Sequence, residues 1–563
     1  MDSKLYEHPL FTVRHELLST EDRLRVTYER AKLVVQTYKL TGEDIVNCTK
    51  RFWDFQQDPV FAIDPALTNI ITCHVNLFIG TLFPLLPGRP DLKPLVEKAL
   101  QAEIFGNMFL SELGHGLDIQ SLETIATKVG DGFILSTPRN SATKFMAPTL
   151  PLDGVQRWGI AMSRLVVDGE DRGIHPFLLQ TSDEHGMRPG VHNVCLPVRS
   201  GSVLDYSLTT FNNVHLPRSA FLGRSTDKPK DPRNLLHSYI WRIPVGTCAI
   251  GMPGVLSGKI LACIAADYSF RRHVGGPKLE VPIISFRTQA LPVLYAVAVS
   301  HVFSAWMSQV VEYFISKATT FDARTVLGTI FKTTANRLVT QTARDLGERL
   351  GAQGLFPQNH LGIMETDIRG TSISEGDITV VCIRLFAEVL TGRRTLLVPA
   401  RTDTLLYRRY LGYVDFNTQL LKSLKRGQRD PQFNNLILPQ CEPAIRALGH
   451  ALAYSAAKDA GLPQPLLDLF EVAVIKLDSG WFAEHAGLTE ARRVMMEDKA
   501  ANAALPHLKQ YVDDLNIRQW VASPLISDRK WDWWLDEVRR DNAGFAGGLL
   551  KRSERLEGML SRL

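Results

Sequence analysis

One carboxylate stands out by its position in the chain. Glu375 lies in RGTSISEGDITVV, directly before Gly376 and at the entrance to the apolar run ITVVCIRLFAEVL. Burial on a desolvated loop raises the pKa of a carboxyl toward the range in which it can take up a proton near neutral pH, and the glycine leaves room for a bound molecule. A carboxyl at this position could serve as a general base, and the helix dipole alone also favours an acid at a helix N-terminus.

A second stretch, residues 105–145, combines small and polar residues. It contains Ser111-Glu112-Leu113-Gly114-His115-Gly116, followed by LETIAT and GFILSTP. Small residues let the backbone approach a bound molecule closely, and a serine hydroxyl can hydrogen-bond such a molecule. Taken alone, Ser111 suits a helix N-cap or turn and His115 suits a loop equally well.

This stretch resembles the flavin-binding entry of the peroxisomal acyl-CoA oxidases, in the acyl-CoA dehydrogenase superfamily. The similarity continues through Pro189-Gly190, 211–223 (FNNVHLPRSAFLG), 268–273 (YSFRRH) and 286–289 (FRTQ), and covers about 1–400 in register. SEGDIT resembles the turn that carries the family's catalytic glutamate. The resemblance therefore implies an FAD-dependent enzyme in which Glu375 removes the α-proton of an acyl-CoA thioester while the β-hydrogen leaves as hydride.

The resemblance implies that no metal takes part. It also implies a set of FAD-binding residues: Ser111, Ala147, Arg272, Gln289, Gly351, Gly354, Gly376 and Thr379. Arg272 would meet the pyrophosphate of a flavin bound largely by a neighbouring subunit, because its fork donates to two oxygens at once. Gln289 would share that face, and Gly351 and Gly354 would form a turn against the adenosine half. A surface salt bridge and a helix C-cap are simpler explanations for the arginine and the glycines.

The chain departs from the family pattern at one wall of the expected flavin site. Where the family has Lys-Trp-Trp-Pro-Gly, the chain has Lys144-Phe145-Met146-Ala147-Pro148, and the following loop TLPLDGVQR is longer than usual. One phenylalanine and one methionine thus replace the two tryptophans that flank the flavin in the family pattern. The glycine that lets the backbone come close to the ring is missing. The substrate channel is therefore expected to differ, and a specialised acyl group is as well supported as a long-chain fatty acyl-CoA.

The elements that must position these residues fall into four blocks, predicting a multidomain α+β fold. Helical periodicity over 1–104 gives way to short β-type runs over 105–230, which predict a compact antiparallel, barrel-like domain. Residues 231–400 predict a helical bundle with one long helix over VGTCAIGMPGVLSGKILACIAADYSFRR, and 401–563 a helical C-terminal extension. A homodimer follows from the split cofactor site. Four C-terminal tryptophans are expected to pack a helix onto the body: Trp520, Trp531, Trp533 and Trp534.

Composition limits the remaining classes. Of 563 residues, 45% are apolar and 22% are charged, which excludes a disordered chain, and 64 basic against 59 acidic side chains give no reason to expect a nucleic-acid partner. The seven cysteines form no CxxC pair and are expected to be reduced, buried thiols. The apolar stretch VLYAVAVSHVFSAWMSQVVEYFI is interrupted by polar residues, so we expect a core helix and no membrane span.

The C-terminus Ser561-Arg562-Leu563 is a conservative relative of the S-K-L address read by the peroxisomal import receptor. A helix that happens to stop there would look the same. The leading hypothesis is an acyl-CoA oxidase of peroxisomal β-oxidation that hands electrons to O₂ and releases H₂O₂. The alternatives are a dehydrogenase-type enzyme with another electron acceptor or a non-CoA substrate, and a non-catalytic scaffold that kept the fold.

Overall fold

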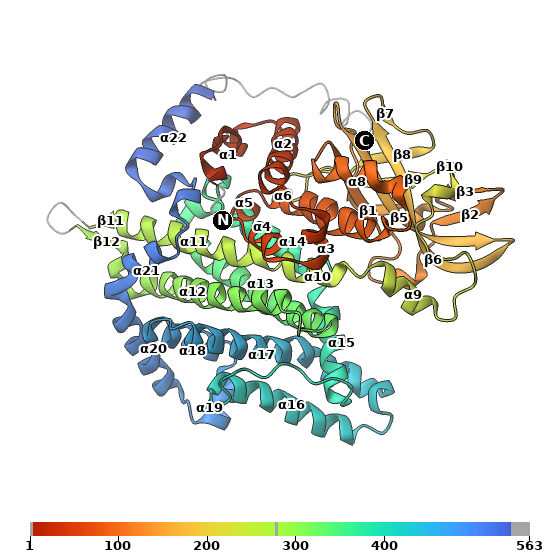
Figure 1. The fold of residues 1–563 in the computed structure, drawn as a ribbon. Helices are drawn as coiled ribbons and strands as arrows, with labels where there is room; N and C mark the ends of the chain where they lie inside the picture. Colours follow the sequence, from red (N-terminus) through yellow and green to blue (C-terminus); the bar gives the residue numbers. More distant parts are fainter. Residues whose placement is uncertain (1–3, 276–279, 542–563) are drawn as a thin grey trace, which may run out of the picture.

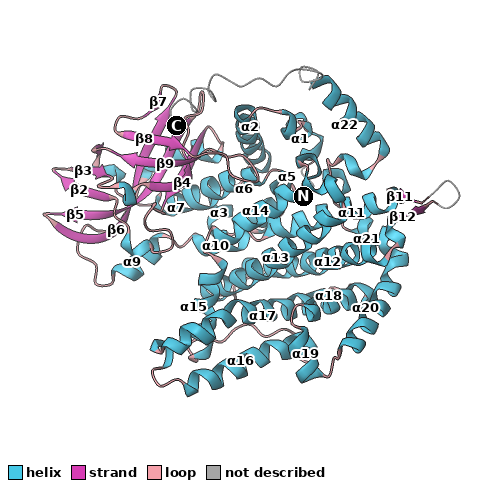
Figure 2. Cartoon of the chain, turned by 180° about the vertical axis from the view of Figure 1, so that it is seen from behind, coloured by secondary structure: helices cyan, strands magenta, loops and turns pink. Residues whose placement is uncertain are grey.

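Helices occupy both ends of the described part of the chain, and the strands gather on one side of the molecule (Figures 1 and 2). The computed structural model describes residues 4–275 and 280–541. N-terminal helices, a β-domain, a helical bundle and a further set of C-terminal helices follow one another along the chain. This is the multidomain α+β architecture predicted above.

The N-terminal part consists of short helices with well-formed caps. The hydroxyls of Ser19 and Thr41 accept hydrogen bonds from the backbone N–H of Asp22 and Asp44, which begins α2 and α3. Between α6 and α7, Thr72–Ile79 form a π-helix, a rare wide winding that is often found at functional sites. The helices are α1 Pro9–Thr12, α2 Thr20–Tyr38, α3 Gly42–Asn47, α4 Lys50–Gln56, α5 Val60–Ile63, α6 Pro65–Ile71, α7 Gly80–Leu82 and α8 Lys93–Leu100.

Two sheets form the β-domain. The larger has the order β10-β3-β2-β5-β6-β7, with β1 paired to β5, and the smaller has the order β4-β9-β8. Their apolar inner faces enclose a core that includes Phe109, Phe133, Phe177 and Phe211. The strands are β1 Ile104–Phe109, β2 Ile125–Val129, β3 Gly132–Ser136, β4 Lys144–Pro148, β5 Gln156–Val167, β6 Glu170–Asp183, β7 Gly186–Met187, β8 Val191–Cys195, β9 Tyr206–Phe211 and β10 Val214–Leu216.

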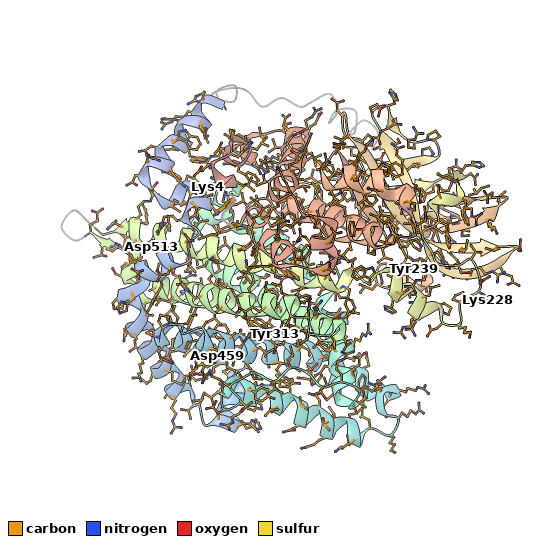
Figure 3. The ribbon with its side chains drawn as sticks, in the orientation of Figure 1. Lys4, Lys228, Tyr239, Tyr313, Asp459 and Asp513 are labelled. Carbon is orange, nitrogen blue, oxygen red and sulfur yellow. The ribbon has the colours of Figure 1, made fainter. Side chains whose placement is uncertain are left out.

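The expectation of a purely antiparallel domain is wrong at two strand pairs. Both β1 and β2 run parallel to β5, with Met108 opposite Ile160 and Ala126 opposite Leu165. Alternation of apolar and polar residues predicts which face of a strand is buried, but it carries no information on strand direction. Helix α9 (Pro232–Tyr239), which ends at the residue labelled in Figure 3, packs on β6, and the Tyr239 hydroxyl lies 3.2 Å from Nδ1 of His175 in that strand.

Three long helices form the centre of the bundle: α11 Met252–Arg271, α12 Arg287–Ile315 and α13 Phe321–Arg349. The single helix expected over 245–272 is instead two, because α10 (Ile243–Ala249) ends before Gly251 and α11 begins at Met252 with Pro253 in its first turn. A proline there lacks only an N–H that would have no partner inside the helix. Two further helices, α14 Leu361–Ile373 and α15 Ile378–Leu390, enclose the turn that contains Glu375.

The C-terminal helices continue the same hydrophobic core. Helix α17 (Leu438–Asp459) packs against α12 and α13, and α16 (Leu405–Ser423) lies on its outer side (Figure 1). Trp520 is buried, Trp531 and Trp534 have ring centroids 5.2 Å apart, and Arg14 lies 4.7 Å from the Trp533 ring, so the tryptophans pack as expected. The remaining helices are α18 Gln464–Lys476, α19 Ser479–Ala486, α20 Glu490–Ala504, α21 Leu508–Asp514 and α22 Asp528–Asp541.

Three helical stretches of the described chain are long and apolar enough to cross a membrane, judged by length and composition alone. They are Pro65–Leu85, Ile243–Arg271 and Arg287–Ile315, and 83%, 94% and 67% of their most apolar windows are buried inside the protein. Of the cysteines, five are buried as expected, but Cys195 is exposed at the end of β8. That strand lies at the edge of the smaller sheet, where alternate side chains point to solvent.

Candidate active site

Glu375 lies in a strained turn between two helices. α14 ends at Ile373, and α15 begins after Asp377, whose side chain caps the helix by accepting from the Val380 N–H. Glu375 has φ 51° and Gly376 has φ 90°. A left-handed conformation is unfavourable for glutamate and persists only where surrounding contacts enforce it. The helix dipole explanation fails here, because Asp377 and not Glu375 occupies the capping position.

Side chains from two other helices hold this turn. Lys332 of α13 is fully buried, and its Nζ donates to the carbonyl oxygens of Ser374 at 2.5 Å and Gly376 at 2.7 Å. The Thr247 hydroxyl of α10 donates to the carbonyl oxygen of Glu375 at 2.6 Å. Three consecutive carbonyl groups are thereby engaged, which fixes the direction of the Glu375 side chain.

The Glu375 carboxyl group lies against α10 and makes no hydrogen bond with the described part of the chain. Its Oε2 is buried and makes no hydrogen bond within the described part of the chain. Gly246 lies alongside, so closely that a Cβ built there would stand 2.4 Å from Oε2 and 2.8 Å from Asn76 Nδ2. Burial raises the pKa of Glu375 to about 7, against the lowering effect of Lys332 and Arg242. The carboxyl can therefore exchange a proton near neutral pH.

A buried arginine completes the surroundings. Arg242 is fully buried, donates to Asn76 Oδ1 from two nitrogens at 2.7 and 3.1 Å, and its own carbonyl oxygen accepts from Asn76 Nδ2. Its pKa is lowered by burial. Asn76 and Cys73 both belong to the π-helix, and burial together with nearby Glu375 raises the pKa of the Cys73 thiol to about 12. The charged neighbours of Glu375 are thus cations.

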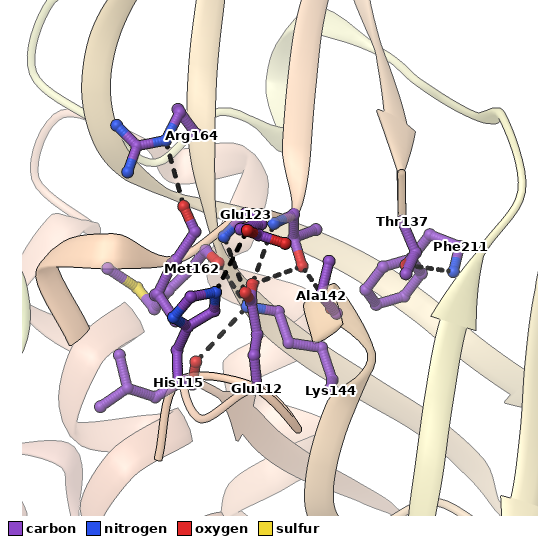
Figure 4. A network of polar contacts seen from close by, with 12 residues as sticks. Glu112, His115, Glu123, Thr137, Ala142, Lys144, Met162, Arg164 and Phe211 are labelled. Carbon is purple, nitrogen blue, oxygen red and sulfur yellow. Dashed lines mark hydrogen bonds and ion pairs between the residues drawn. The ribbon is translucent and has the colours of Figure 1, made fainter. Parts of the chain in front are cut away.

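A buried ion pair between Glu112 and Lys144 holds the Ser111–Gly116 segment in place (Figure 4). Lys144 Nζ lies 2.9 Å from Glu112 Oε1, and both side chains are 0% exposed. Glu112 also accepts from the backbone N–H groups of Glu123 and Thr124 and from the Thr124 hydroxyl. His115 Nε2 lies 3.4 Å from Glu123 Oε1. The glutamate of the motif is therefore structural, and Ser111 is left partly exposed at the edge of the segment.

A second group of the predicted residues gathers at the far end of the bundle. Gln289 Nε2 donates to Ser269 Oγ at 2.9 Å and to the carbonyl oxygen of Arg349 at 3.2 Å. The turn that contains Gly351 and Gly354 follows directly, and a Cβ at Gly354 would stand 2.2 Å from the Gly347 carbonyl oxygen. Arg272, at the end of α11 three residues after Ser269, is exposed.

The two groups are far apart within one chain. Lys332, which contacts the Glu375 turn, and Arg349, which contacts Gln289, are 17 residues apart on α13, or about 25 Å along an α-helix. Thr379 belongs to neither group, because its exposed hydroxyl donates to Glu442 of α17 at 3.1 Å. No cluster of three or more His, Cys, Asp or Glu that could hold a metal occurs among residues 4–275 and 280–541.

Known proteins are similar to this chain in sequence and in architecture. The chain is 24% identical over 306 residues to an acyl-coenzyme A oxidase of Caenorhabditis elegans and 26% identical over 353 residues to peroxisomal acyl-coenzyme A oxidase 3 of Homo sapiens. These matches cover 51% and 57% of the chain and 44% and 49% of the relatives. The chain thus spans about half the length of the curated relatives it matches. No protein-family model matches it.

Solved structures agree over nearly the whole chain. Acyl-CoA oxidase 1 of Yarrowia lipolytica matches with TM-score 0.78 at 18% identity, covering 99% of this chain and 91% of that one. Acyl-CoA oxidase 1 of C. elegans, solved with FAD and ATP, matches with TM-score 0.74 at 16% identity, covering 100% and 93%. The chain is a divergent relative of the acyl-CoA oxidases. The predicted resemblance and fold are therefore confirmed.

The departure from the acyl-CoA oxidase pattern lies in a distorted strand. Met146 has φ 72° and is exposed, and the pairing of β4 with β9 shifts register between Phe145 and Pro148. Ala147 is partly buried and packs against the core of the β-domain. The segment 144–148 is thus a bulge that exposes Met146 where the resemblance led us to expect an aromatic side chain.

Several residues around Glu375 were missed by sequence reasoning: Asn76, Arg242, Gly246, Thr247 and Lys332. Only Lys332 carried a local signal, since it is a single lysine in the otherwise uncharged run TVLGTIFKTTAN. A buried lysine needs a polar partner, but its partners here are backbone carbonyl groups 42 and 44 residues away. Spacing along the chain could not reveal them.

Proposed function

We propose that this chain is an FAD-dependent acyl-CoA oxidase in which Glu375 removes the α-proton of an acyl-CoA thioester. The proposal rests mainly on the Glu375 carboxyl group. Its Oε2 lies beside Gly246 without a hydrogen-bond partner in the described chain, and burial raises the pKa of the group to about 7. A general base works best when its pKa lies near the operating pH. The names of the related proteins supply the reaction class.

The residues of the chain fit a flavin in two places. Near Glu375, the carboxyl Oε2 has no hydrogen-bond partner in the described chain, and Gly246 lets this carboxyl group lie against the backbone of α10, where a Cβ would collide with it. At the far end of the bundle, the exposed Arg272 makes no side-chain hydrogen bond or ion pair with the described residues and would suit a pyrophosphate, and Leu355 and Phe356 after the glycine turn are 85% and 50% exposed. Apolar side chains so exposed favour burial against another molecule.

A homodimer would reconcile these two places. The Glu375 turn and the group that contains Gln289 and Arg272 lie about 25 Å apart along α13 of one chain. We therefore propose that the Gln289 group binds the flavin of a neighbouring copy. Ser111 and Ala147 would line the ring from the β-domain. Thr379 would join them only if its hydroxyl left Glu442. The oxidase structure of C. elegans solved with FAD supports this choice of cofactor.

Glu375 would do the proton chemistry with help from its turn. The ionised carboxylate takes the α-proton, and Lys332 and Arg242 stabilise the ionised form from behind. The backbone N–H of Glu375 is oriented by the same turn and would polarise the thioester oxygen. When bound, the flavin would accept the β-hydrogen as hydride and pass the electrons to O₂, which yields H₂O₂. The product is a 2-enoyl thioester.

The acyl group is proposed to be a specialised one, because Met146 and the bulge around it replace the aromatic wall. A peroxisomal location is proposed from the relatives named peroxisomal. Ser561-Arg562-Leu563, the import signal that would deliver the enzyme, lies outside the described residues.

The experiment uses purified full-length protein loaded with FAD. Saturated acyl-CoAs of several chain types are added under air and H₂O₂ is measured, and a redox dye is then supplied without oxygen. H₂O₂ formed in proportion to enoyl-CoA supports the oxidase. Dye reduction without H₂O₂ would instead support a dehydrogenase-type enzyme, and a protein that shows no flavin absorbance after addition of FAD would support a non-catalytic scaffold.

A further inference from the structure

A cavity of about 210 Å³ lies among the C-terminal helices, separate from the Glu375 site. One side of α17 forms its floor, with four residues at helical spacing on the same face. Since one water occupies about 30 Å³ of liquid, the cavity has room for a small organic molecule. Its lining residues are Leu406, Arg409, Tyr413, Pro443, Arg446, Ala447, His450, Val474, Leu477, Asp478 and Phe482.

Most of the charges at this cavity cancel in pairs. Arg409 forms an ion pair with Asp478, which also accepts a hydrogen bond from the Tyr413 hydroxyl at 3.1 Å. Close by, Glu442 is paired with Arg337, whose two nitrogens contact its two carboxylate oxygens at 2.7 and 3.0 Å. The acids nearest to the cavity are thus already neutralised.

Arg446 lines the cavity and belongs to neither of these ion pairs. Within the described chain its guanidinium makes no hydrogen bond and no ion pair, although it is half-buried and burial lowers its pKa. A guanidinium in such surroundings normally has an anionic partner. Because Arg446 lines the cavity, a molecule inside it could supply that partner.

His450 provides a second unpartnered group one turn further along α17. It is 4% exposed, and its Nε2 is buried without a hydrogen-bond partner within the described chain. Burial and the nearby Arg446 lower the pKa of His450 to about 3, so the ring is neutral and can donate one N–H without adding charge. The remaining walls are apolar side chains from α16, α17, α18 and α19.

We infer that this cavity is a binding site for a small organic monocarboxylate, held by Arg446 and His450 with its hydrocarbon part against the apolar walls. A guanidinium fork matches a carboxylate with two parallel hydrogen bonds. One uncompensated positive charge balances one negative charge, and a second negative charge on the ligand would find no unpaired cation among the lining residues. The site therefore favours a carboxylate over a phosphate, and the inference does not depend on the proposed reaction.

The test is isothermal titration of the full-length, flavin-loaded protein with butyrate. Butyramide serves as the uncharged analogue of the same shape, and inorganic phosphate serves as the competing anion. We expect butyrate to bind and both other compounds to bind at least about tenfold more weakly, the loss that follows from removing charge-assisted hydrogen bonds.

Variants locate the binding. Arg446→Met removes the charge and Ala447→Leu fills the cavity while leaving the charge in place, so each should weaken butyrate binding about tenfold or more. Arg344→Met, an exposed arginine on α13, is the control that should bind as the wild type does. Flavin absorbance and melting temperature report whether each variant is folded.

Three results would overturn the inference. The first is absence of butyrate binding at millimolar concentration, which would leave a cavity filled by water alone. The second is butyrate binding that Arg446→Met and Ala447→Leu, both folded, leave unchanged, which would place the acid elsewhere, for instance in the acyl channel. The third is phosphate or butyramide binding as tightly as butyrate.

Discussion

Lys332 holds the two residues that flank Glu375. Its Nζ donates to the carbonyl oxygens of Ser374 at 2.5 Å and Gly376 at 2.7 Å. One side chain therefore enforces the left-handed conformation of Glu375 and places a positive charge behind its carboxylate. Burial lowers the pKa of Lys332 to about 7, with Glu375 as the largest opposing influence. The two groups are coupled, and this coupling makes the site testable by pH.

The first prediction concerns the pH dependence of the wild-type enzyme. Glu375 must be ionised to act as a base, and its pKa is about 7. The rate of flavin reduction by acyl-CoA should therefore be low at pH 5, rise through about pH 7 and level off above it. Stopped-flow absorbance without oxygen measures this directly. A rate that stays constant between pH 5 and 9 would mean that another group is the base.

The second prediction concerns Lys332→Met. Removing the cation leaves Glu375 with burial as the dominant influence, so the pKa of the carboxyl should rise and the pH profile should move to higher pH. The plateau rate should also fall by about tenfold or more, because the turn loses two charge-assisted hydrogen bonds. Lys259→Met, a partly buried lysine of α11 whose pKa is also lowered by burial, should keep the wild-type profile. An unshifted profile in a folded, yellow Lys332→Met protein would refute the role of Lys332.

The third prediction concerns the space beside the carboxylate. In Gly246→Ala, the new Cβ would stand 2.4 Å from Glu375 Oε2 and would displace the side chain. We expect a loss of turnover of about 100-fold, as for a misplaced catalytic group, with flavin still bound. Gly362→Ala on α14 is the matched control, because a Cβ there meets nothing within 4 Å. Equal activities of the two variants would show that Glu375 tolerates displacement.

The fourth prediction concerns the ion pair that pins the Ser111–Gly116 segment. Glu112→Gln leaves Lys144 buried without a countercharge, which should lower the free energy of unfolding by about 3–5 kcal/mol. Asp171→Asn removes one partner of an exposed ion pair with Arg164 in the same domain and should cost about 0–1 kcal/mol. Urea unfolding compares them. Similar losses in both variants would show that the buried pair contributes no more than a surface contact.

The sequence predicted what depends on local pattern. The Glu375-Gly376 pair before an apolar helical run located the turn, and the apolar stretch VLYAVAVSHVFSAWMSQVVEYFI located the greater part of α12. The pattern of short β-type runs located the β-domain. Each of these features depends on residues that are consecutive in the sequence. The resemblance to the acyl-CoA oxidases indicated how the elements combine into domains.

What the sequence could not predict depends on contacts between distant segments. Arg242 and Asn76 are 166 residues apart and meet only because α10 packs on a π-helix, whose winding has no simple sequence signature. The parallel pairing of β1 with β5 was missed because periodicity does not encode direction. Thr379 contacts α17 because helix packing, not sequence proximity to Glu375, decides where its hydroxyl points.

The most direct test of the central claim is the anaerobic reduction of bound flavin by an acyl-CoA in Glu375→Gln. The substitution keeps the shape of the side chain and removes its ability to take a proton. The account predicts that the variant binds FAD with wild-type absorbance and that flavin reduction slows by about 100-fold or more at pH 8. Reduction at the wild-type rate would contradict it and show that the α-proton leaves by another route.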